Sequence, residues 1–181
     1  MEFLCLEYVN SSWYITHKLL SDPLRNSEWL IKLAEKWLHI ILPAPTEAEL
    51  ADLIEIRSCF ARLLTKIVQE KDLDKTDIEL LNRYMGDVSF SRQLKAVKEG
   101  YRLYDIPVTQ DWSWFMVEAA ASLARLYSSE AAGSLKTCQN PECGWFFIDE
   151  SKSRNRKWCD DTCATLMKVR RFREKQKASD K

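Results

Sequence analysis

Apolar residues recur at helical spacing in four stretches of the first 130 residues. Such spacing predicts amphipathic helices, which we expect over residues 28–38, 46–69, 74–85 and 111–128. Capping signals support these bounds. Ser27 precedes the first helix, Thr46 and Glu49 form a capping box on the second, Gly86 ends the third, and Asp111 opens the fourth. The first part of the chain is therefore predicted to be mainly helical.

Two further stretches of this part follow a different pattern. Residues 93–98 and 101–108, joined around Gly100, are typical of a β-hairpin. Residues 3–10 form a short apolar run, which periodicity does not assign to strand or helix. We therefore expect a mainly α domain with one β-hairpin (α+β class) over residues 1–133.

The last part of the chain, residues 134–181, predicts a second, smaller domain. Residues 135–137 and 145–148 favour short strands, and residues 151–157 are polar and basic, as in a loop. Apolar residues at Leu166, Val169 and Phe172 then predict a helix from about residue 162 to residue 177.

Charge is distributed unevenly, although 27 basic and 27 acidic residues cancel over the whole chain. Residues 1–150 carry 16 basic and 23 acidic side chains, a net charge of −7, and residues 151–181 carry 11 and 4, a net charge of +7. A basic tail on an acidic body indicates a polyanionic partner for the tail, or a contact between tail and body.

Several functional classes are not expected. The sequence has no apolar run long enough for a membrane span and no pattern of a secretory signal, so we expect a cytoplasmic protein that does not enter membranes. Glycine-rich phosphate loops are absent, as are Ser/His/Asp and HExxH patterns, so we do not expect an enzyme.

Four cysteines in the last 44 residues form the most specific motif, two close pairs divided by a loop. Four residues separate Cys138 from Cys143, fifteen follow, and three separate Cys159 from Cys163. This spacing is typical of a structural zinc site with four thiolate ligands. With a short strand on each side of the first pair and a helix after the second, it predicts a treble-clef-like finger that holds one Zn²⁺.

Other uses of the cysteines are less consistent with the sequence. A disulfide or redox pair is disfavoured in a reducing cytoplasm, and neither His17 nor His39 lies near the motif in sequence. Since four cysteines leave no open coordination position, the zinc is expected to be structural rather than catalytic. Cys5 and Cys59 are expected to be small buried apolar residues.

A dense set of cations surrounds the predicted site. Such a set binds phosphates through counterion release, and arginines on a helix can read guanine edges in a major groove. We therefore expect DNA contacts from Arg154, Arg156, Lys157, Lys168, Arg170, Arg171 and Arg173. The alternative is a protein-interaction module, in which the finger docks a partner or its own acidic body.

The helical domain offers one polar set within apolar surroundings, namely Glu7, Asn10 and Arg57. Buried polar groups need partners, so a Glu7–Arg57 ion pair is expected. The set is interpreted as an internal tether or as the lining of a small-molecule ligand pocket. Homodimerisation through this domain is also left open.

The opening segment Leu4–Asn10 together with the segment Cys138–Asp149 resembles the CGNR zinc-finger family. The resemblance implies an N-terminal ABATE domain that senses a ligand or mediates dimerisation. It further implies a zinc finger with the four cysteines as ligands, DNA binding, and the role of a stress-induced transcription regulator. The chain departs from the family at the fourth ligand, where Cys163 is followed by Ala-Thr-Leu instead of Gly-Asn-Arg. Arg170 or Arg171, about one turn further on, is a candidate to replace the missing arginine.

Overall fold

The computed structural model describes residues 3–17 and 21–179. It is mainly α-helical, as the sequence predicted, and the predicted β-hairpin is joined by a second, short antiparallel pair formed by the two finger strands. In chain order the elements are α1 (Leu4–Asn10), α2 (Trp13–Thr16), the 3-10 turn η1 (Pro23–Arg25), α3 (Ser27–Leu38), α4 (Glu47–Val68), α5 (Lys75–Met85), β1 (Phe90–Val97), β2 (Gly100–Pro107), α6 (Trp112–Tyr127), the 3-10 turn η2 (Glu130–Ser134), β3 (Leu135–Thr137), β4 (Phe146–Ile148) and α7 (Asp161–Ser179).

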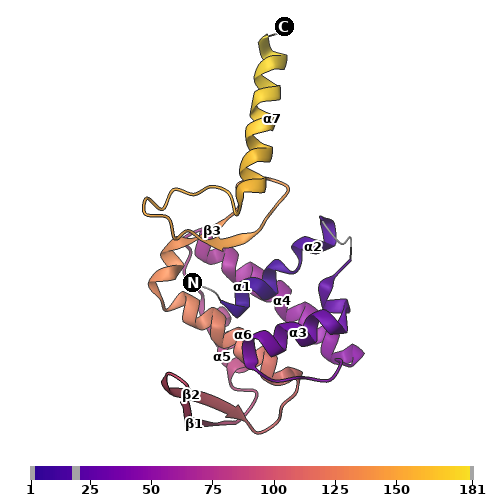
Figure 1. Ribbon diagram of the computed structural model, residues 1–181, viewed down its shortest axis with the longest axis vertical. Helices are drawn as coiled ribbons and strands as arrows, with labels where there is room; N and C mark the ends of the chain where they lie inside the picture. The colour runs from indigo at the N-terminus through magenta and orange to yellow at the C-terminus, as the bar shows by residue number, and fades with distance from the viewer. Residues whose placement is uncertain (1–2, 18–20, 180–181) are drawn as a thin grey trace.

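Helix α1 lies at the centre of the core, between α4 and α6 (Figure 1). The ring of Tyr8 packs edge-on against Phe115, with ring centres 5.3 Å apart, and its hydroxyl donates to the carbonyl oxygen of Leu53. Cys5 is fully buried, and burial raises the pKa of its thiol to about 12, so it is an inert core residue as expected. Because the surroundings cover this segment on nearly all sides, its apolar run carries no helical periodicity.

The residues that cap the helices are those predicted from the sequence, except at the start of α3. Thr46 and Glu49 form the expected capping box at the start of α4. The side chain that caps α3 belongs to Asn26, not Ser27, because its oxygen accepts the N–H groups of Glu28 and Trp29. Cys59 is also less buried than expected, since it lies at the edge of the core.

The first hairpin pairs Phe90 with Pro107 at its base and Val97 with Gly100 at its tip. Strand β1 therefore begins three residues before the predicted strand. Gly100 has a φ of +113°, a conformation that side-chain-bearing residues rarely adopt, which explains the glycine at the turn.

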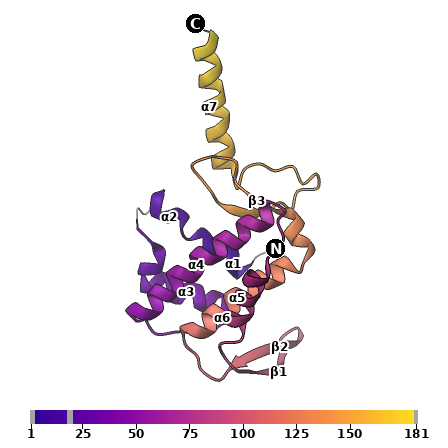
Figure 2. The same cartoon turned by 180° about the vertical axis from the view of Figure 1, so that it is seen from behind.

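Helix α7 and the β1–β2 hairpin lie at opposite ends of the molecule (Figures 1 and 2). The helix rises from the finger and points away from the helical body. Helix α7 therefore does not pack along the helical body, but Arg170 of the basic tail contacts the acidic part of the chain through an ion pair with Glu142. Across the described ranges, none of the helices is both long and apolar enough to cross a membrane.

Candidate metal centre

A short hairpin presents the first cysteine pair. Strands β3 and β4 pair Thr137 with Phe146, so the chain between them forms a tight turn that carries Cys138 and Cys143. The N–H of Cys138 donates to the Trp145 carbonyl at 2.9 Å. Gly144 has a φ of +68°, which bends the chain back into β4 after the second ligand.

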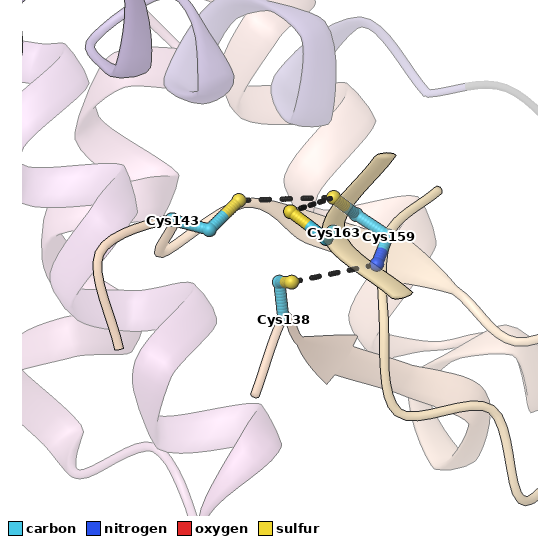
Figure 3. Close-up of side chains that lie close together, drawn as sticks. All are labelled: Cys138, Cys143, Cys159 and Cys163. Carbon is cyan, nitrogen blue, oxygen red and sulfur yellow. Dashed lines mark hydrogen bonds between the residues drawn. The ribbon is translucent and has the colours of Figure 1, made fainter. Parts of the chain in front are cut away.

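The start of α7 presents the second pair. Cys159 precedes the helix and Cys163 lies in its first turn. The carboxylate of Asp160 accepts the N–H of Cys163 at 2.8 Å, in the manner of a helix cap. All four side chains converge on one point between the β3–β4 turn, which we call the knuckle, and helix α7 (Figure 3).

The spacing of the four sulfurs fits a tetrahedral zinc ion. All four lie within 4.8 Å of one another. The Sγ atom of Cys159 is 3.7 Å from that of Cys143 and 3.7 Å from that of Cys163. With zinc–sulfur bonds of about 2.3 Å, the edges of a regular tetrahedron measure about 3.8 Å. Cys138, Cys143, Cys159 and Cys163 therefore form a site for one zinc ion.

The electrostatics of the four thiols also favour a bound zinc ion. Burial, together with the neighbouring thiols, raises the pKa of Cys143 to about 11 and that of Cys159 well above its ordinary range. Burial also opposes ionisation of Cys138, but backbone N–H groups of Cys159 and Asn140 lower its pKa overall. Four sulfurs this close repel one another as thiolates, so a bound dication is needed for all of them to ionise.

Aromatic residues surround the cysteines. Three of the four cysteines are buried, and Trp13, Trp145 and Trp158 pack around them. The buried amide of Asn140 donates to the Cys163 sulfur at 3.5 Å. Because four sulfur ligands leave no coordination position for water or substrate, this is a structural site.

An ion pair between a half-buried lysine and a buried aspartate, which the sequence analysis missed, holds the loop of residues 150–157. Lys136 donates to Asp149 at 2.6 Å, and Asp149 also accepts the backbone N–H groups of Ser151 and Arg156. The lysine lowers the pKa of Asp149 well below its usual range, with the Ser151 hydroxyl contributing next. A lone Lys–Asp pair thirteen residues apart carries no sequence signal.

The predicted cations divide into two groups. Arg156 braces the finger, because its guanidinium donates to the carbonyls of Trp158 and Cys159 and lies 5.3 Å from the Phe147 ring centre. Arg170 forms an ion pair with Glu142 of the knuckle. The remaining predicted cations are exposed on the loop and on α7: Arg154, Lys157, Lys168, Arg171 and Arg173.

The expected ion pair between Glu7 and Arg57 is wrong. The guanidinium of Arg57 binds both carboxylate oxygens of Asp22, at 2.7 and 2.5 Å. Glu7 instead accepts from Lys36 and from the indole of Trp37. Glu7 of α1 thus contacts α3, whereas Arg57 of α4 contacts the residue that caps η1, and the sequence spacing does not reveal which elements meet.

Asn10, the third member of that polar set, serves another purpose. Its amide donates to the Phe146 carbonyl at 2.8 Å and accepts the Phe146 N–H at 2.9 Å. Glu7, Asn10 and Arg57 thus bind three different partners and do not form one pocket.

The segment after Asn10 extends this contact between body and finger. Trp13 packs edge-on against Trp145, with ring centres 5.8 Å apart. His17 stacks on Trp13 and contacts the Glu142 carbonyl through Nε2. These aromatic contacts were also missed, because such pairing across more than a hundred residues leaves no local pattern.

The fold and the site define a helical body joined to a four-cysteine zinc-binding module. Residues 134–176 match the model of the CGNR zinc finger family. No curated protein matches the chain.

Proposed function

We propose that the chain is a cytoplasmic DNA-binding transcription regulator whose zinc finger contacts DNA through helix α7 and the loop of residues 150–157. The observation that carries the proposal is the placement of α7. The helix projects from the molecule with Lys168, Arg171 and Arg173 exposed along it (Figure 1). A projecting cationic helix can approach phosphates and enter a major groove without a clash from the body.

Arg170 holds this helix against the finger, and the exposed Arg171 contacts an aromatic ring beside it. Arg170 ties α7 to Glu142, and the guanidinium of Arg171 lies 5.6 Å from the Trp158 ring centre. Arg170 and Arg171 lie about one turn after Leu166, the position at which the family pattern has its arginine, and are proposed to compensate for it. Arg170 is therefore proposed as a positioning residue, and the exposed cations as the phosphate contacts.

The helical body is proposed to act as an ABATE-like sensory or dimerisation domain without catalytic activity. Asn10 and Trp13 couple it to the finger, so a change in α1 or α2 would alter how the finger is held. Docking of the finger on another protein remains the alternative function. It would use the exposed apolar residues Leu166, Val169 and Phe172 of α7.

Fluorescence anisotropy with a labelled mixed-sequence duplex tests DNA binding by the zinc-loaded full chain. We expect affinity to fall steeply between about 50 and 200 mM salt. Each alanine substitution at Lys168 or Arg173 should lower the slope of log affinity against log salt by about 0.9.

The matched control is a pair of exposed cations at the other end of the molecule, Lys98→Ala and Arg102→Ala, which should leave the slope unchanged. Salt-independent or absent binding would refute the DNA proposal and favour the protein-docking alternative.

A further inference from the structure

A cavity lies between the helical body and the finger, beside the metal centre. Its volume of about 630 Å³ falls within the range of small-molecule sites, roughly 300 to 1,000 Å³. The body contributes Trp13, Tyr14 and His17 to the lining, and the finger contributes Trp145 and the residues around the second cysteine pair. We call it the body–finger cavity. It is separate from the polar set that the sequence analysis singled out in the body, because none of those three residues lines it.

Aromatic rings form one wall of the body–finger cavity. The ring centre of Trp145 lies 5.8 Å from that of Trp13 and 6.2 Å from that of Tyr14, and the ring centres of Trp13 and Tyr14 are 5.3 Å apart. The three ring planes are nearly perpendicular to one another, at 77 to 89°, so they are oriented like the walls of a corner. His17 stacks on one face of Trp13, so we assign the ligand contacts to Tyr14 and Trp145. The faces of such rings are electron-rich and attract cations.

The rest of the lining is negative. Asp160 brings an exposed carboxylate. Cys143, Cys159 and Cys163 also line the cavity, and four thiolates around one Zn²⁺ retain a net negative charge. The described residues of the lining include neither lysine nor arginine. The cavity therefore disfavours phosphates and carboxylates and favours a positive charge.

We propose that the body–finger cavity binds a small organic cation of the quaternary ammonium class. In such a cation the positive charge is surrounded by apolar methyl groups, which suit both the aromatic wall and the neighbouring carboxylate. Because Tyr14 belongs to the body and Asp160 to the finger, the bound cation would contact both parts of the chain at once.

Binding of the cation is independent of the proposed DNA contacts. The cations assigned to phosphate on α7, Lys168, Arg171 and Arg173, do not line the cavity. A sensory role for the ligand rests on the proposed function, whereas its binding does not. Loss of ligand binding and loss of DNA binding are consequently separable results.

Isothermal titration calorimetry of the zinc-loaded full chain, without DNA, tests the proposal. The probes are choline and its neutral carbon isostere 3,3-dimethylbutanol, which have nearly the same shape and differ in charge. We expect choline to bind at least about tenfold more tightly, because a cation gains an attraction to aromatic faces that the neutral molecule lacks.

Two substitutions place the site. Asp160→Asn should weaken choline binding by about three- to tenfold, because it removes the charge while the amide oxygen still caps α7. Tyr14→Leu should weaken it by a similar factor of about three to ten, because it removes an aromatic ring but keeps an apolar side chain. Zinc content and circular dichroism check that both variants are folded.

Each substitution has a matched control outside the cavity. Asp161→Asn removes the adjacent carboxylate, and Tyr101→Leu removes an exposed ring of the β1–β2 hairpin. Both should retain the wild-type affinity for choline. A chain that does not bind choline would overturn the proposal. So would equal affinity for the neutral isostere, or a choline affinity that neither Asp160→Asn nor Tyr14→Leu lowers relative to its control.

Discussion

Asn10 and Phe146 are joined by two hydrogen bonds, although 136 residues separate them. The amide of Asn10 uses its donor and its acceptor on the backbone of β4, so a side chain of the body acts as an additional strand partner for the finger. Phe146 and Leu135 in turn pack into the core of the helical body. The finger is therefore attached to the body through its first hairpin.

Asn10→Ala should destabilise the chain by about 2 to 4 kcal/mol, because it leaves a buried N–H and a buried carbonyl of Phe146 without partners. Urea unfolding of the zinc-loaded protein measures this change. The exposed Asn82→Ala serves as the control and should change stability by less than about 0.5 kcal/mol. Equal effects of the two substitutions would refute a special role for Asn10.

Asn140→Ala should weaken zinc binding by about 10- to 100-fold without removing the site, because the amide donates to the Cys163 sulfur rather than to the metal. Competition with a chromophoric chelator measures the affinity. The adjacent Gln139 is exposed, so Gln139→Ala should retain the wild-type value.

Cys143→Ser should abolish stoichiometric zinc binding and unfold residues 135–170, since zinc supplies on the order of 10 kcal/mol to such modules. Plasma mass spectrometry and limited proteolysis report the two effects. The helical body should persist with a lower melting temperature, because loss of the finger exposes Leu135 and the surface that covered Phe146. Cys59→Ser should keep one zinc per chain, and a finger that stays intact in Cys143→Ser would refute the metal site.

Asp77 should make the folding stability of the helical body sensitive to acid. Burial alone would raise its pKa, but ion pairs with Lys66 and Arg62 lower it from 3.8 to about 2. Since the folded pKa is depressed, the carboxylate stabilises the fold above about pH 4, and this contribution is lost as the pH falls towards 2.

Asp77→Asn should therefore cost on the order of 1 to 2 kcal/mol near neutral pH and much less near pH 2 to 3. Urea unfolding of the wild type and the variant at each pH gives the difference in their free energies of unfolding. Zinc release at low pH affects both proteins alike and therefore cancels in this difference. A difference that does not change with pH would contradict the assignment.

The sequence by itself determined helices α3, α4, α5 and α6 of the body, the first hairpin and the zinc ligands. These features are local: helical periodicity, capping side chains and the spacing of two cysteine pairs act within a few turns of chain or one short loop. The Thr46–Glu49 capping box and the four converging cysteines illustrate this, because each is specified by residues that are close in sequence.

Only the tertiary structure decided the state of residues 3–10, the partners of Glu7 and Arg57, and the attachment of the finger through Asn10. An apolar run buried on nearly all sides carries no periodicity, so its environment selects the helix. Which side chains form an ion pair depends on which elements pack together, and Arg57 of α4 pairs with Asp22, which caps η1. Likewise, whether a cation such as Arg156 braces its own domain or faces solvent depends on the path of the chain around it.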